Sequence, residues 1–157
     1  MKARTNHVEF SAEELPLPPW TGEAESFIQK VLSELGLNNW DLSVLFCKNK
    51  YIKSLNAQYR NMDEATDVLS FPMGEKNRAG RFMAGDIVIS LEALEENSRH
   101  FKVPADEELR RLLIHAILHL SGEDHPSNKA EEPMLKSQEE ILARLNELII
   151  LKHLGEN

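Results

Sequence analysis

The chain has 157 residues and a formal net charge of −8, with 41% hydrophobic and 28% charged residues. That length suits a single domain over residues 1–157 with a sizeable core, and the near-average composition excludes wholesale disorder. The acidic balance excludes a protein that coats nucleic acid or an anionic membrane by bulk electrostatics, although it permits a local basic groove.

The cysteine content and the hydropathy pattern indicate where the protein works. The lone Cys47 excludes an internal disulfide and a thiolate zinc cluster, which favours a reducing, cytoplasmic environment. The first ten residues carry two positive charges with no apolar run behind them, unlike a secretory signal. No apolar stretch approaches the roughly 18 residues of a membrane span. We therefore expect a cytoplasmic protein with no membrane partner.

The N-terminal part of the chain predicts two strands and two helices. A short strand is expected at residues 7–10, before a proline-rich lead-in. Thr21 is placed to cap a helix whose apolar residues repeat at helical spacing until Gly36, a residue type that often ends helices. Alternating apolar residues over 40–46 predict a strand, and a second amphipathic helix follows over residues 51–60.

The middle of the chain predicts two more strands separated by a loop. Residues 67–72 are β-branched and aromatic, and we expect Pro72 to end this strand. Residues 73–84 contain two glycines and predict a mobile loop before a strand over residues 85–90. Ser90 is placed to cap the helix that follows.

Three helices complete the predicted fold. The first covers residues 91–100, and the second is opened by Pro104 at its first position and closed by Gly122. The third runs from about residue 133 to residue 154. Several helices with short, closely spaced strands predict an α+β domain, in which a small mixed sheet of about four strands is packed by helices.

The most informative feature is a group of three histidines at the end of the second of these helices. His115 and His119 are four residues apart and so project from one face of a helix. His125 follows Gly122, which lets the chain reverse and return the third imidazole towards the first two. Three imidazoles with one open position form a known catalytic zinc arrangement. The sequence therefore predicts a metal centre at a helix end and the following turn.

The remaining candidate ligands favour an open, catalytic site over a closed, structural one. A structural zinc site uses four protein ligands, usually with cysteines among them. Cys47 is far away in sequence, and Asp124 is better explained as a solvent-facing or supporting residue. Zinc is the first choice, but three imidazoles also suit nickel, copper or iron, so other transition metals stay open.

The chemistry expected of such a site is hydrolysis. A zinc ion bound by three histidines lowers the pKa of its water to about 7 and yields hydroxide at neutral pH. Peptidases with the H-E-x-x-H signature carry a glutamate base after the first histidine, and Ala116 occupies that position here. Glu123 is an alternative base, but a solvated loop acid is the simpler interpretation, and the general base stays open.

Arg60 is the residue that indicates the chemical class of the substrate. It follows the helix at residues 51–60 and precedes the strand at residues 67–72. A guanidinium near a metal can clamp a phosphate and stabilise the charge that develops in phosphoryl transfer. A surface salt bridge is the default explanation of an isolated arginine.

The pattern of these motifs resembles the YbeY family of metal-dependent endoribonucleases. The family's hallmark is H-G-x-L-H-L-x-G-aromatic-D-H, and this chain has H-A-I-L-H-L-S-G-E-D-H at residues 115–125. The resemblance extends upstream through L-N-x-x-Y-R at residues 55–60, T-D-V-L-S-F-P at residues 66–72 and G-D-I-V-I-S at residues 85–90. Two departures are Ala116 for glycine and Glu123 for the aromatic residue.

The resemblance implies a function and a site. It implies that His115, His119 and His125 are metal ligands of a catalytic zinc-type centre, and that Arg60 is catalytic or contacts the substrate. It also implies a four-stranded α+β fold and cleavage of single-stranded RNA, chiefly small-subunit ribosomal RNA, in rRNA maturation and ribosome quality control. The partners would then be ribosomal RNA and the ribosome or its proteins.

Two other functions remain open at this point. One is a non-catalytic ribosome-assembly factor whose metal only locks the turn, and the other is a metallohydrolase acting on a small substrate. The charge distribution favours RNA, because residues 48–81 hold seven basic and four acidic residues, a local charge of +3, while the rest of the chain carries −11. We therefore expect one positive face beside the histidines on an otherwise acidic body.

Overall fold

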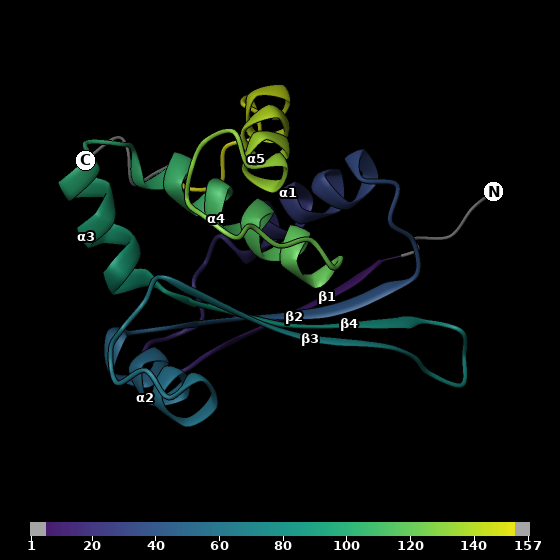
Figure 1. Cartoon of the computed structure of the whole chain (residues 1–157), viewed down its shortest axis with the longest axis horizontal. Helices are drawn as coiled ribbons and strands as arrows, with labels where there is room; N and C mark the ends of the chain where they lie inside the picture. Colours follow the sequence, from purple (N-terminus) through teal and green to yellow (C-terminus); the bar gives the residue numbers. More distant parts are fainter. Residues whose placement is uncertain (1–5, 153–157) are drawn as a thin grey trace.

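The structure is a computed structural model that describes residues 6–152, which form one four-stranded sheet and five α-helices (Figure 1). The strands are β1 (His7–Ala12), β2 (Trp40–Cys47), β3 (Val68–Lys76) and β4 (Phe82–Ser90). The helices are α1 (Thr21–Glu34), α2 (Asn49–Arg60), α3 (Leu91–Phe101), α4 (Ala105–Leu120) and α5 (Pro133–Arg144). The predicted α+β class is confirmed. None of these helices is both long and apolar enough to cross a membrane.

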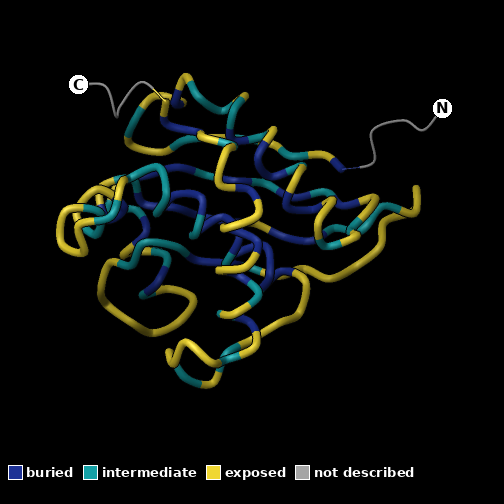
Figure 2. The backbone as a smooth tube through the Cα atoms, turned by 90° about the horizontal axis from the view of Figure 1, so that it is seen from above, coloured by how far each residue is buried: buried dark blue, intermediate teal, exposed yellow. Residues whose placement is uncertain are grey.

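The sheet separates two layers of helices. Its strand order is β1-β2-β4-β3, with β1, β2 and β4 parallel and β3 antiparallel to β4 at one edge. Helices α1, α4 and α5 lie on one face and α2 lies on the other (Figure 1). The main core fills the space between the sheet and α1, α4 and α5, while a smaller apolar cluster lies under α2. Figure 2 shows the buried positions gathered along the middle of the molecule.

Helix α4 is the central helix of its layer. Nine of its 16 residues are buried, so its position is set by packing on several sides. Its last two turns carry the two histidines of the predicted metal centre, His115 and His119, and both are only partly buried. The core therefore holds the backbone of these histidines while their rings remain accessible from one side.

The predicted helix starts are confirmed at Ser90 and shifted by one residue at two other positions. The Ser90 hydroxyl accepts a hydrogen bond from the N–H of Ala93 at 3.1 Å, which caps α3. Thr21 is not the cap of α1 but its first helical residue, because the carbonyl of Trp20 already accepts the first helical bond. Pro104 likewise precedes α4, and its carbonyl accepts from the N–H of Glu108.

The predicted mobile loop at residues 73–84 is wrong, because most of this segment forms the two arms of a β-hairpin. The strand β3 continues through Pro72, and residues 77–81 connect it to β4. Pro72 does not end the strand because β3 lies at the edge of the sheet, where a proline need not break a ladder bond. The side chain of Asn77 accepts two backbone N–H groups and holds the turn.

The last helix is shorter than the predicted span of residues 133–154. It ends at Arg144, and the last two residues of that span lie outside the described part of the chain. The apolar residues beyond Arg144 have the pattern of a continued helix. Ile150 and Leu151 do pack in the core, but they are not helical. The Asp106 carboxylate accepts the backbone N–H groups of both, at 2.7 and 2.8 Å, which replaces the missing helical bonds.

Gly85 provides a stability prediction, because β3 and β4 approach closely at this position. It has φ +135°, and a Cβ atom there would lie 2.2 Å from the Phe71 carbonyl oxygen. We expect Gly85→Ala to lower the free energy of unfolding by about 3 kcal/mol, through backbone strain and the collision together. Urea unfolding measures the change. Gly80→Ala is the control, since Gly80 has φ +82° but open space around it. An equal loss in both variants would refute the collision.

Cys47 provides a second prediction, on reactivity. It is fully buried in the apolar cluster under α2, and burial raises the pKa of its thiol to about 12. About one thiol in 10⁴ is then ionised at pH 8, and reagents cannot reach it. We expect no alkylation by iodoacetamide in the folded chain at pH 8 and one equivalent in urea, measured by mass spectrometry. Modification of the folded chain within minutes would contradict this burial.

Candidate metal centre

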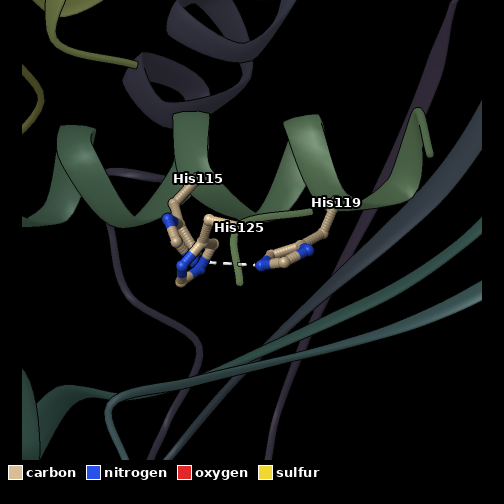
Figure 3. A group of neighbouring side chains, drawn as sticks. All are labelled: His115, His119 and His125. Carbon is tan, nitrogen blue, oxygen red and sulfur yellow. Dashed lines mark hydrogen bonds between the residues drawn. The ribbon is translucent and has the colours of Figure 1, made fainter. Parts of the chain in front are cut away.

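The three predicted histidines converge on one point (Figure 3). His115 and His119 project from the last turns of α4, and His125 returns from the loop that follows it. One ring nitrogen of each lies within 4.8 Å of the others, and all three side chains are partly buried. Gly122 has φ +104°, the backbone conformation that reverses the chain after α4. Among the described residues, these three form the one group of this kind.

The tautomers of His119 and His125 follow from their backbone partners. The Nδ1 of His119 lies 3.1 Å from the carbonyl oxygen of Glu123, and the Nδ1 of His125 lies 3.0 Å from that of Ser127. A carbonyl oxygen only accepts, so both Nδ1 atoms carry the proton and donate it. In the neutral rings, each Nε2 therefore presents a free lone pair.

The tautomer of His115 is set by a side chain from α5. Its Nδ1 lies 2.6 Å from Oε1 of Gln138. The Nε2 of Gln138 donates to the Glu139 carboxylate at 2.9 Å, and since a carboxylate only accepts, the amide must present its oxygen to His115. His115 therefore donates from Nδ1, and its Nε2 also carries a free lone pair.

These lone pairs fit a shared cation. The Nε2 atoms of His115 and His119 lie 3.2 Å apart, yet neither carries a proton to donate to the other. Two nitrogen ligands of one tetrahedral zinc ion, each at 2.0–2.1 Å, lie about 3.3–3.4 Å apart. The contact between these two nitrogens thus has the spacing of a ligand pair. A positive ion between them would remove the repulsion that two facing lone pairs otherwise have.

Burial keeps two of the candidate ligands in the form that binds a metal. Desolvation lowers the pKa of His115 and of His119 below the ordinary value of 6.5, and the positive charge that a neighbouring imidazole gains on protonation adds to this. Both rings are therefore neutral at pH 7, the form that binds a metal. The donor set of three imidazole nitrogens suits zinc and other transition metals.

Arg60 lies on the same cleft as two of the three histidines. The cleft has a volume of about 690 Å³, and its walls include Arg60, His115 and His119. Arg60 comes from the end of α2, and its Nη2 donates to the carbonyl oxygen of Ser70 on the edge strand β3 at 3.1 Å. Within the described residues, this carbonyl is the one hydrogen-bond partner of its guanidinium, which has five donors in all.

The other candidate ligands do not join the three histidines. Cys47 faces α2, across the sheet from α4. The Asp124 carboxylate accepts the backbone N–H of His125 at 2.8 Å, which makes it a residue that shapes the loop. Glu123 also lines the cleft, and its carbonyl oxygen supports His119. Among the described residues, the candidate centre therefore brings together three histidines and leaves one side accessible.

Comparison with known proteins identifies the family. The family profile described as Endoribonuclease YbeY matches residues 7–146 of this chain. The chain belongs to the YbeY family. A relative from Treponema denticola named Endoribonuclease YbeY is 52% identical over 132 residues, which is 82% of this chain and 85% of the relative. One with the same name from Aquifex aeolicus is 40% identical over 126 residues, covering 80% of this chain and 83% of the relative.

A solved structure supports the fold. The solution structure of a protein from Thermotoga maritima matches with a TM-score of 0.58 and 28% identity, and the match covers 89% of this chain and 90% of that one. Membership of the YbeY family confirms the resemblance drawn from the motifs, and with it the expectation of a nuclease. The alternative in which the chain is no enzyme loses its support.

The two departures from the YbeY hallmark fall where the structure tolerates them. Ala116 is fully buried in α4 among apolar neighbours, where a small helix-forming side chain fits. Glu123 supports His119 through its backbone carbonyl, which any residue type supplies.

The residue that sequence reasoning missed is Gln138. It is polar but lies on the buried stripe of α5, in line with Met134, Ile141 and Leu142. A glutamine at a position where the helical period calls for an apolar residue is a signal of a buried hydrogen bond. The sequence does not say which partner it meets, because His115 is 23 residues away and belongs to another helix.

Proposed function

We propose that this chain is a single-strand-specific, zinc-dependent endoribonuclease that matures small-subunit ribosomal RNA in the cytoplasm and takes part in ribosome quality control. The proposal names His115, His119 and His125 as the metal ligands of the catalytic centre and Arg60 as the residue that holds the scissile phosphate. The observation that carries it is the convergence of three imidazole rings, two of which line a cleft that also contains Arg60.

The residues of the cleft have separate tasks in this reaction. A divalent cation bound by the histidines supplies a Lewis acid that polarises a phosphoryl oxygen and lowers the pKa of water. Arg60 donates to the non-bridging oxygens of the phosphate and stabilises the negative charge that grows on them. The Ser70 carbonyl accepts one N–H of Arg60 and so orients the guanidinium on the edge of the sheet.

The partial exposure of the site favours a polymer substrate over a small one. The three histidine side chains are all partly exposed, and Arg60 is exposed. A chain of nucleotides can therefore lie along the cleft, with its phosphates in contact with Arg60. Of the basic residues in 48–81, Arg81 is paired with Asp41 at 2.6 Å, so it adds little to a positive face. That face, and the binding of the ribosome or its proteins, stay predictions.

A cleavage assay tests this function. We expect the zinc-loaded chain to cut a single-stranded 16S-derived oligonucleotide, to leave the same sequence intact in a duplex, and to lose activity with a chelator. Added zinc should restore cleavage. Equal cleavage of the duplex would overturn the single-strand preference, and full activity in the chelator would overturn the metal requirement. Cleavage without any preference for ribosomal sequences would remove the rRNA assignment.

A further inference from the structure

Among the described residues, Gln138 is the one side chain that holds a predicted metal ligand from outside the loop and helix that carry the histidines. His119 and His125 are held by backbone carbonyls four and two residues further along the chain. His115 instead depends on α5, where Gln138 is 6% exposed and accepts from Nδ1 at 2.6 Å. The orientation of His115 is therefore coupled to the docking of a separate helix.

A network of charged residues fixes the amide of Gln138. Glu139 accepts its N–H at 2.9 Å and is itself held by both Nε and Nη2 of Arg111, at 2.8 and 3.2 Å. Arg111 also donates to Glu107 and Glu108 one turn earlier on α4. Because Arg111 precedes His115 by one turn of the same helix, the network ties α5 to the helix that bears the histidine. The amide cannot turn over without placing its oxygen against the Glu139 carboxylate.

We propose that Gln138 is a positioning residue of the metal centre, which holds the ring of His115 in the tautomer and direction that aim Nε2 at the ion. This inference rests on the proposed metal site. It assigns to α5 a role in metal affinity that the histidine motif does not contain. An outer hydrogen bond of this kind contributes about 10- to 100-fold in metal affinity. Since binding and docking are coupled, a bound ion also stabilises the packing of α5 on α4.

Two substitutions of Gln138 separate hydrogen bonding from packing. Gln138→Met fills the same buried space, but its thioether sulfur is only a weak acceptor for the N–H at Nδ1. Gln138→Glu, always combined with Glu139→Gln so that two carboxylates do not face each other, keeps an acceptor oxygen of the same reach. The probes are Zn²⁺, titrated in competition with a chromophoric chelator, and Co²⁺, whose visible absorption reports tetrahedral coordination. We expect Gln138→Met to weaken Zn²⁺ binding by about 10- to 100-fold and to reduce the Co²⁺ absorption, and Gln138→Glu to stay within about threefold of the unmodified chain.

The controls keep the inference falsifiable. Lys136→Ala, on the exposed side of α5, should leave both readouts unchanged. Glu139→Ala changes an exposed residue and is expected to fold even if Gln138→Met does not. It should weaken Zn²⁺ binding by less than Gln138→Met, because the amide is then free to turn over. Unchanged binding in Gln138→Met, or in Glu139→Ala where Gln138→Met does not fold, overturns the role of Gln138. An equal loss in Gln138→Met and Gln138→Glu overturns it as well. If the unmodified chain binds neither ion, the metal site itself is wrong.

Discussion

His119→Ala is expected to remove the metal and the activity together. Two imidazoles remain in this variant, and two nitrogen ligands do not hold a divalent ion as three do. The loss of the ion removes several kcal/mol of transition-state stabilisation, so cleavage of single-stranded RNA should fall by at least about 10³-fold. Metal content after dialysis, measured by mass spectrometry, should fall from one ion per chain to a small fraction.

The fold should survive this change, which makes the experiment clean. His119 is only partly buried, near the end of α4, and alanine has the highest helix propensity. The far-ultraviolet circular dichroism should therefore match that of the unmodified chain. His100→Ala is the matched control, because His100 is an exposed histidine near the end of α3, in edge-to-face contact with Phe101. If His119→Ala keeps its metal and cleaves within tenfold of the unmodified chain, the assignment of His119 as a ligand fails.

The histidine group was predictable because its geometry is local. A spacing of four residues on a helix places His115 and His119 on one face, and the glycine after the helix permits the return of His125. The convergence of the three rings thus follows from the helical period and one turn. Their backbone partners at Glu123 and Ser127 are local as well, but they are carbonyl groups, and no side-chain pattern announces them.

The parts that were not predictable depend on tertiary position. A proline such as Pro72 breaks a strand in the interior of a sheet but not at its edge. The order of the strands, which decides between the two, is not visible in the local pattern. The apolar residues after Arg144 continue the helical pattern, although Asp106 holds them in a non-helical segment. The partner of Gln138 likewise follows only from the packing of α5 on α4.

These errors share one physical cause. A pattern of apolar residues reports that a segment is buried, and the choice between helix, strand and turn is then made by contacts with distant elements. The site is less sensitive to this ambiguity than the fold. Two of its three histidines lie on α4, a largely buried helix in which local and tertiary preferences agree.

Arg60→Ala is expected to reduce kcat/KM for RNA cleavage by about 10²- to 10³-fold while the metal content stays at that of the unmodified chain. This loss corresponds to about 2.7–4 kcal/mol of transition-state stabilisation, the usual contribution of a donor aimed at developing charge. The metal should stay because Arg60 bonds to the Ser70 carbonyl and to no histidine. Arg60→Ala thus separates phosphate binding from metal binding. His119→Ala, in contrast, removes the metal and the activity together.

Two further variants decide how Arg60 acts. Lys53→Ala removes an exposed charge from the same helix and should change kcat/KM by less than about twofold, since a single surface charge steers RNA only weakly. Arg60→Lys keeps the charge but lacks the planar fork that contacts two phosphate oxygens, so it should recover only part of the lost activity. Full recovery in Arg60→Lys would reduce Arg60 to a point charge. Activity of Arg60→Ala within threefold of the unmodified chain would show that the phosphate is held by other residues of the cleft.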